Sequence, residues 1–361
     1  MPHLAGWVEN TRSLSQFGTD TGIRSHPLFV LLQAGLIYAG FRSMGAMLAL
    51  FSPSTVTLVA ASVFLSMSAG WAGPVKNGFD LSDATVPVDE IRQGGPPRDG
   101  IPSIDEPRFV LGSASKLSSG DRVLGVFVGG VAKAYPIGIL NWHEIVNDRF
   151  GDQRIVVTFC PLCGTGMAFD ARVAGKERTF GVSGLLYNSD VLLYDRESES
   201  LWSQIAKSAV SGTLKGEQLN PVVTTHTTWA DWQRRYPGTV VLSENTGHVR
   251  DYGRDPYRGY ESSRDVYFPV ARTDSRYHPK ERVIGLELNG HVKAYPYVEL
   301  SQGSGRLADR VGDQPVIVEF DMEQQTGRVL DQHGVELPTV IAFWFAWSAF
   351  HPQGEVYRSG S

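Results

Sequence analysis

The sequence of 361 residues is poor in cysteine: Cys160 and Cys163 are the only two, and both lie in one Cys-x-x-Cys. Without a second such pair, a structural zinc site of four cysteines from one chain is excluded. Positive charge is also scarce, since the formal net charge is −5, which argues against binding to nucleic acid. No glycine-rich phosphate loop follows a strand and opens a helix, so no nucleotide cofactor is expected.

Glycine and proline, by contrast, are abundant. The 39 glycines and 20 prolines, against 20% charged residues, favour many short strands and tight turns over a helical bundle. An apolar fraction of 42% is enough for a packed core. The sequence therefore predicts an α+β fold that is mainly antiparallel β.

The N-terminal region has the pattern of a targeting segment. No charged residue lies between Arg42 and Lys76, and two apolar stretches in this interval are followed by small residues. The pattern is typical of a secretory signal peptide with cleavage near Gly70 or Ala72, and an uncleaved anchor is the alternative. We therefore expect residues 1–72 to be a signal peptide or N-terminal anchor, the protein's one contact with a membrane. The remainder is expected outside the cytoplasm, periplasmic or secreted.

An internal duplication organises the rest of the chain. Residues 122–140 (RVLGVFVGGVAKAYPIGIL) resemble residues 282–300 (RVIGLELNGHVKAYPYVEL), and residues 148–159 resemble 309–320. Each copy predicts a hairpin, a short helix and a strand, with the first helix over residues 137–147. Duplicated hairpin-helix-strand units are therefore expected.

The duplication suggests a division of the chain. The expected parts are an extended lead-in over residues 73–106, a first repeat with inserted strands over 107–270, and a second, degenerate repeat over 271–361. We also expect strands over residues 166–173, 179–185 and 191–195, and a helix over residues 229–236. The apolar residues 339–350 fit either a strand or a helix.

The polar residues that differ between the copies indicate chemistry in the first. His143, Cys160 and Cys163 have no counterpart in the second copy, although its framework residues are kept. Two thiolates and an imidazole suit copper(I) or zinc, so we predict a soft-metal site made by these three residues. The fourth coordination position of such a metal site is open, or one of three further side chains fills it. These are Met167, His226 and His248.

Three other uses of the cysteine pair remain open. Thiol-disulfide exchange fits a strand that leads into Cys-x-x-Cys, although Gly164 and Gly166 oppose the helix that such proteins place after it. Zinc-dependent deamination needs His-x-Glu and Pro-Cys-x-x-Cys, whereas His143 and Glu144 are adjacent and Pro161 lies inside the pair. A structural disulfide in a non-enzymatic binding protein is the third. Whether the protein is an enzyme is left open.

A second polar cluster lies in residues 183–204 (SGLLYNSDVLLYDRESESLWSQ). Its aromatic, amide and charged side chains combine stacking surface with hydrogen-bonding capacity, which favours a pocket. The alternative is a hairpin with residues 188–190 as its turn and a surface ion pair between Asp195 and Arg196. The residues predicted to line the pocket are Glu144, Tyr187, Asn188, Asp190, Asp195, Arg196, Trp202 and Gln204.

Together with YPIGILNWHEIVND and VTFCPLCGTGMAFD, this segment resembles an uncharacterised family of bacterial and archaeal proteins, a domain of unknown function that is commonly exported. The resemblance covers about residues 85–350. It implies relatedness and no particular reaction. It also implies that His143, Cys160, Cys163 and residues 183–204 occupy the signature positions of that family.

Overall fold

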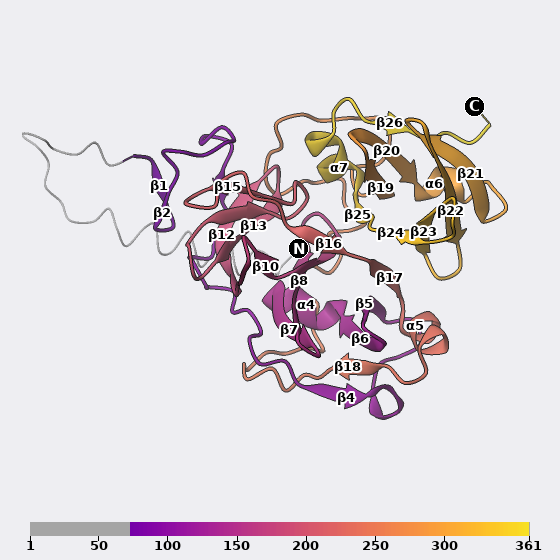
Figure 1. Ribbon diagram of the computed structural model, residues 1–361, viewed down its shortest axis with the longest axis horizontal. Coiled ribbons are helices and arrows are strands. Elements are labelled where there is room, and N and C mark those ends of the chain that lie inside the picture. Colours follow the sequence, from indigo (N-terminus) through magenta and orange to yellow (C-terminus); the bar gives the residue numbers. More distant parts are fainter. Residues whose placement is uncertain (1–72, 361) are drawn as a thin grey trace, which may run out of the picture. The chain divides into compact units, whose positions relative to one another are not determined.

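The chain was analysed as a computed structural model, which describes residues 73–360 (Figure 1). The expected targeting segment, residues 1–72, lies outside the described residues. From Pro74 onward the described chain falls in one compact unit. Within this part, no helix combines the length and the apolarity that crossing a membrane requires.

Short strands are the main regular structure of the described chain, and its sheets are almost entirely antiparallel. The largest sheet has the order β26-β20-β19-β25-β9-β8-β7, with β16 paired to β9. Two sheets of five strands have the orders β15-β14-β13-β12-β3 and β17-β5-β6-β18-β4, and a sheet of four has the order β21-β22-β23-β24. The prediction of an α+β, mainly antiparallel fold is confirmed.

The bounds of the elements that matter below are as follows. The first repeat contains β5 (Arg122–Val128), β6 (Val131–Pro136), α4 (Ile137–His143), β7 (Ile145–Phe150), β8 (Gln153–Cys160), β9 (Thr165–Asp170), β17 (Thr224–Thr228), α5 (Trp229–Arg235) and β18 (Val240–Leu242). The second contains β19 (Arg282–Leu288), β20 (His291–Pro296), α6 (Tyr297–Leu300), β21 (Arg306–Val311), β22 (Gln314–Asp321), β23 (Thr326–Asp331), β24 (Glu336–Leu337), β25 (Val340–Phe343), α7 (Trp344–Phe350) and β26 (Glu355–Val356).

The remaining elements are shorter or lie between these. The lead-in carries β1 (Val75–Lys76), β2 (Phe79–Asp80) and β3 (Arg92–Gln93). The first repeat begins with β4 (Phe109–Leu111) and a 3₁₀ turn over Gly112–Ala114. Inserted in the first repeat are β10 (Arg172–Val173), β11 (Lys176–Glu177), β12 (Phe180–Tyr187), β13 (Asp190–Asp195), β14 (Leu201–Ser203), β15 (Ser208–Ser211) and β16 (Asn220–Val222).

The two copies fold alike, strand by strand. The hairpins β5–β6 and β19–β20 share one register, with Val123 opposite Pro136 and Val283 opposite Pro296. In the first copy, β17 pairs antiparallel with β5, α5 follows, and β18 pairs parallel with β6. In the second copy, β25 pairs antiparallel with β19, α7 follows, and β26 pairs parallel with β20. The duplication therefore extends to the C-terminal segment, beyond the similarity recognised in the sequence.

A glycine in each first hairpin strand shows how closely the copies correspond. A Cβ atom on Gly125 would lie 2.3 Å from the ring of Trp232 in α5, and one on Gly285 would lie 2.2 Å from the ring of Trp347 in α7. Each indole ring thus lies directly on the backbone of the strand, which leaves no room for a side chain.

Two predicted elements differ in the structure. The first helix ends at His143 instead of residue 147, because Glu144 takes a positive φ of 58° and β7 begins at Ile145. The apolar segment that fitted either a strand or a helix contains both, since β25 is followed directly by α7. Helix α7 is buried on nearly all sides, which explains why all its residues except Ser348 are apolar.

The repeats are joined through their strands. Strand β9 of the first repeat pairs with β25 of the second, with Gly166 opposite Ile341. The Phe343 N–H also donates to the Cys163 carbonyl at 2.8 Å. The cysteine loop of the first repeat is therefore held by a strand of the second.

Candidate functional site

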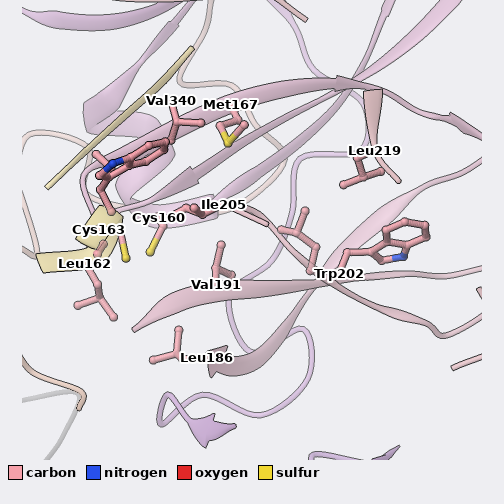
Figure 2. Close-up of a cluster of buried hydrophobic side chains, with 14 of the residues drawn as sticks. Cys160, Leu162, Cys163, Met167, Leu186, Val191, Trp202, Ile205, Leu219 and Val340 are labelled. Atoms are coloured by element: carbon pink, nitrogen blue, oxygen red, sulfur yellow. The ribbon is translucent and has the colours of Figure 1, made fainter. Parts of the chain in front are cut away.

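Strand β8 ends at Cys160, and a tight turn returns the chain through Cys163 and Gly164 to β9. Gly164 has a positive φ of 61°, and a Cβ atom there would lie 2.8 Å from the ring of Phe343. Cys160 is 1% exposed and Cys163 is fully buried, and both are free thiols. Figure 2 shows their sulfur atoms side by side within a cluster of buried hydrophobic side chains.

The tip of the β12–β13 hairpin meets this loop. Tyr187 pairs with Asp190, and the two residues between them, Asn188 and Ser189, have φ of 50° and 65°. This is the two-residue turn with positive φ at both central positions. It directs the Ser189 carbonyl to the thiols, so that the Cys163 sulfur donates to it at 3.2 Å.

Asp190 is the third member of the cluster. Among residues 73–360, one group of at least three candidate ligands has its ligand atoms within 4.8 Å of one another, and it consists of Cys160, Cys163 and Asp190. Asp190 is fully buried, and its Oδ2 atom accepts the Ile205 N–H at 3.0 Å. Burial raises the pKa of this carboxyl to about 7.

Several buried oxygen atoms near the thiols have no hydrogen-bond partner within the described chain. They include the Asp190 Oδ1 and Ser189 Oγ atoms and the Gln204 Oε1 atom, whose amide nitrogen donates to Thr158 at 2.7 Å. Most buried polar atoms in proteins are paired, and unpaired ones gathered in one place are typical of a site that takes an ion or a water molecule. The donor atoms around the thiols are therefore suited to a bound ligand.

Glu144 provides a second buried carboxyl beside Asp190. Burial, and then the proximity of Asp190, raise the pKa of Glu144 to about 8. Its backbone has φ 58° and ψ −30°, a conformation that glycine adopts much more readily. Strained backbone positions of this kind cluster at functional sites in proteins.

One buried cation faces the same cluster. Lys280 is 4% exposed, and its ammonium lies 3.9 Å from the centre of the Tyr260 ring and donates to the Asp265 carbonyl at 2.5 Å. Burial lowers the pKa of Lys280 to about 8. The pKa of the Cys163 thiol is raised well above its usual range by burial, then by Cys160 and Asp190, while Lys280 opposes this effect.

The His143 ring has other partners than the thiols. Its Nδ1–H donates to the Pro102 carbonyl at 2.8 Å, so its Nε2 atom accepts from the Tyr252 hydroxyl at 2.6 Å. Burial lowers the pKa of His143 to about 4, which keeps the ring neutral. His143 is not part of the Cys160, Cys163 and Asp190 group, so the third ligand atom near the sulfurs comes from a carboxylate.

His143 instead helps to bind α4 to the long loop that connects β18 and β19. Residues 243–281 contain no helix or strand, and they include Tyr260 and Lys280 of the site. Helix α4 binds this connection by three adjacent side chains. These are Asn141, bonded to Asp255 at 3.0 Å, Trp142, bonded to the Arg254 carbonyl at 3.1 Å, and His143.

The residues predicted to line a pocket separate into two groups. Glu144, Asp190 and Gln204 lie around the thiols as described, and Asn188 accepts the Ala271 N–H at 2.8 Å. Other members have structural roles: Tyr187 packs edge-on against Phe350, and Trp202 donates to the buried Asp195 at 2.9 Å. Asp195 contacts Arg178, whereas Arg196 pairs with Asp105 at 2.9 Å, so no ion pair joins Asp195 to Arg196.

The three side chains considered as further ligands lie in different surroundings. Met167 is buried in the hydrophobic cluster that contains both cysteines. The His226 Nε2 atom lies 3.2 Å from the Gly166 nitrogen and 3.0 Å from the Gly166 carbonyl oxygen, and the exposed His248 ring is tilted against the ring of His143. Sequence reasoning missed Lys280 and Tyr260, because nothing in their local pattern links them to a loop more than 90 residues earlier.

The second repeat lacks this site. The counterpart of the cysteine loop, residues 321–324, has its first three side chains exposed and carries no thiol. The two thiols and Asp190 therefore lie in the first copy, whereas Lys280 comes from the second.

A sequence model of the family described as Protein of unknown function (DUF3179) matches residues 98–336, which is more than half of the chain. No curated protein and no solved structure matches the chain.

Proposed function

The chain thus belongs to this family of unknown function, and from its own geometry we propose that it binds one soft metal ion through Cys160, Cys163 and Asp190. The observation that carries the proposal is the convergence of two sulfurs and a carboxylate, all buried, within 4.8 Å of one another. They come from two separate turns of the chain, so the arrangement does not follow from the Cys-x-x-Cys alone.

The donor set is suited to zinc. Zinc accepts thiolate and carboxylate ligands together, whereas copper(I) favours sulfur and needs the two thiolates alone. The Asp190 Oδ1 atom has no partner among the described residues, and it is available as a ligand atom while Oδ2 keeps its bond to Ile205. We therefore favour zinc, with copper(I) as the alternative soft metal.

The charges around the cluster support the same proposal. Two thiolates and one carboxylate carry three negative charges, which a divalent ion and the nearby Lys280 ammonium would balance. An isolated negative cluster of this kind is too costly to bury, and without a metal the Cys163 thiol keeps the proton that it donates to the Ser189 carbonyl. Metal binding would release this proton, because the thiolate is the form that binds a metal.

Metal analysis of purified protein tests the proposal. The wild type, loaded with zinc and desalted, is expected to retain about one ion per chain, and Cys160→Ser is expected to lose it. Asp190→Asn is expected to weaken zinc binding strongly and copper(I) binding little. Asp170→Asn serves as the matched control, because Asp170 lies in β9, in the same sheet as Cys160, but outside the cluster.

The result for His143 separates this geometry from the alternative ligand set. His143→Gln is expected to retain the metal, because both ring nitrogens already have partners. Loss of the metal from this variant with its fold intact, or full retention of the metal in Cys160→Ser, would contradict the proposed ligands.

Thiol-disulfide exchange is the second candidate, and one observation favours it. A buried carboxyl whose pKa is about 7 lies beside two free thiols, where it can accept a proton as one of them attacks the disulfide of a partner. The partner disulfide would be reduced to two thiols while Cys160 and Cys163 form the new disulfide. A reduction potential well below about −300 mV, or thiols that glutathione disulfide does not oxidise, would exclude this activity.

We also infer that the protein acts outside the cytoplasm, on the basis of the uncharged N-terminal stretch and its small-residue end. The mass of the protein recovered from the native host tests this inference. A chain that begins near residue 71 or 73 would support it, and an intact N-terminus in the cytosol would contradict it.

A further inference from the structure

A cavity of about 690 Å³ lies beside the cysteine loop, on residues that the metal proposal does not use. Phe159, Pro161 and Gly164 of that loop contribute to its wall, whereas neither cysteine nor Asp190 lines it. The connection that contains Tyr257 also contributes. Its volume falls within the range of about 300–1,000 Å³ typical of sites for small molecules.

Two arginines from equivalent positions of the repeats line this cavity. Arg122 is the first residue of β5, and Arg282 is the first residue of β19. Both are partly buried. The duplication therefore brings two guanidinium groups to one cavity.

The two guanidinium groups differ in their partners. Arg282 pairs with Glu261 at 2.6 Å, and the Glu261 side chain is 60% exposed. Arg122 donates to the carbonyl oxygens of Gln324 at 2.6 Å and Gln325 at 3.0 Å. Among the described residues, no carboxylate lies within 4.0 Å of Arg122. Its guanidinium group therefore forms its hydrogen bonds with uncharged carbonyl oxygens.

The environment of Arg122 disfavours its charge. Burial, and then the proximity of Arg282, lower the pKa of Arg122 to about 10. A bound anion would offset both effects, and planar guanidinium groups bind carboxylates through two hydrogen bonds at once. The remaining charges on the cavity wall cancel, because three side chains are cationic (Lys116, Arg254 and Arg258) and three are acidic (Asp121, Glu244 and Asp255).

Apolar side chains line the cavity between the charged groups. Phe343 lies under the Arg282 guanidinium, with 5.3 Å from its ring centre to the cation. Val123, Phe159 and Leu242 add further apolar surface. His226 also lines the cavity, but burial lowers its pKa to about 3, so it is neutral. The cavity wall therefore combines the cationic pair Arg122 and Arg282 with an apolar surface.

We propose that this cavity binds a small organic acid, with its carboxylate between Arg122 and Arg282 and its apolar part on the aromatic wall. The duplication supplies the cationic pair, and the unpaired Arg122 is the group that the ligand neutralises. The site is independent of the metal cluster, since the residues that form it differ.

Calorimetric titration with three probes tests the proposal. Benzoate carries both features of the ligand, benzyl alcohol lacks the charge, and inorganic phosphate lacks the apolar part. Benzoate is expected to bind saturably. Benzyl alcohol is expected to bind at least about tenfold more weakly, because it loses the hydrogen bonds of a charged group to the arginines. Phosphate is also expected to bind at least about tenfold more weakly, because it has no apolar part to bury on the aromatic wall. Phosphate binding as tight as benzoate, or equal binding of benzyl alcohol, would overturn the assignment.

Variants locate the binding. Arg122→Gln and Arg282→Gln are each expected to weaken benzoate binding about tenfold or more. The control Arg172→Gln removes a 60% exposed side chain outside the cavity and is expected to change nothing. Cys160→Ser is expected to bind benzoate normally. If Arg122→Gln proves unstable, Arg282→Gln decides alone, and unchanged affinity in a folded Arg282→Gln variant would overturn the proposal.

Discussion

The thiol of Cys163 donates to the main-chain carbonyl of Ser189 at 3.2 Å across 26 residues of sequence. The contact depends on the left-handed backbone of Ser189, which turns the carbonyl toward the cysteine loop. The approach of Asp190 to the two thiols thus follows from the geometry of this hairpin turn.

The Ser189 side chain is not needed for this contact. Ser189→Gly is expected to stabilise the protein by up to about 1 kcal/mol, because glycine adopts positive φ at the second central position of this turn without strain. Thermal unfolding measures the change, with Ser189→Ala, which keeps the strained Cβ atom, as the control. A lower melting temperature for Ser189→Gly than for Ser189→Ala would show that the strain argument fails.

The buried Glu144 carboxyl predicts a pH dependence of stability. Its pKa is about 8 in the folded protein and about 4.5 when unfolded. Between these values the unfolded chain loses a proton that the folded chain keeps, so the stabilisation is full below pH 4.5 and is lost as the pH rises to 8. Denaturant titrations of metal-free protein should show this loss.

Glu144→Gln removes that titration. The variant is expected to gain stability relative to the wild type as the pH rises from 4.5 to 8, by on the order of 2 kcal/mol. The exposed Glu323→Gln serves as the control. Parallel stability curves for the wild type and Glu144→Gln would refute a raised pKa at this position.

The contacts of His143 predict a local effect. The Tyr252 hydroxyl lies 2.6 Å from both His143 Nε2 and Thr246 Oγ1, so Tyr252→Phe removes two hydrogen bonds and is expected to cost about 1–2 kcal/mol. Amide hydrogen exchange should accelerate in residues 243–281 and remain slow in β8 and β9. Uniform acceleration over the whole chain would instead indicate global destabilisation.

The glycines under the two indole rings predict matched effects in the two repeats. Gly125→Ala and Gly285→Ala each force a Cβ atom into the ring of Trp232 or Trp347, at an expected cost of about 1–3 kcal/mol. Gly138→Ala has open space around it and lies in α4, so it is expected to be neutral or slightly stabilising. Chemical denaturation compares the three, and a neutral Gly285→Ala would contradict the equivalence of the repeats.

The hairpin, helix and strand of each repeat could be predicted because their signals are local. The pairs Gly129-Gly130 and Asn289-Gly290 mark the turns, and alternating apolar residues mark the strands. A further signal was present and overlooked: Trp229 and Trp232 recur as Trp344 and Trp347. The chain between β9 and β17 in the first copy is much longer than the chain between β23 and β25 in the second. The tryptophan pairs are therefore separated by another number of residues than the hairpins are, which hides this part of the duplication.

The site could be predicted only in part. The two thiols are adjacent in sequence, and Asp190 was identified as a polar residue beside a turn. That the turn packs on the cysteine loop depends on how two sheets meet, which no local pattern encodes. The end of α4 at His143 was missed for a related reason, since the positive φ at Glu144 is stabilised by the surrounding structure and opposes the preference of the residue itself.

The pairing of β9 with β25 also sets the order in which the chain can complete its fold. The cysteine loop is synthesised about 180 residues before Phe343, whose N–H group closes it from the far side. Until that C-terminal strand pairs with β9, the two thiols lack part of their enclosure. A protein truncated before β25 would therefore keep its cysteines in sequence and leave them permanently accessible.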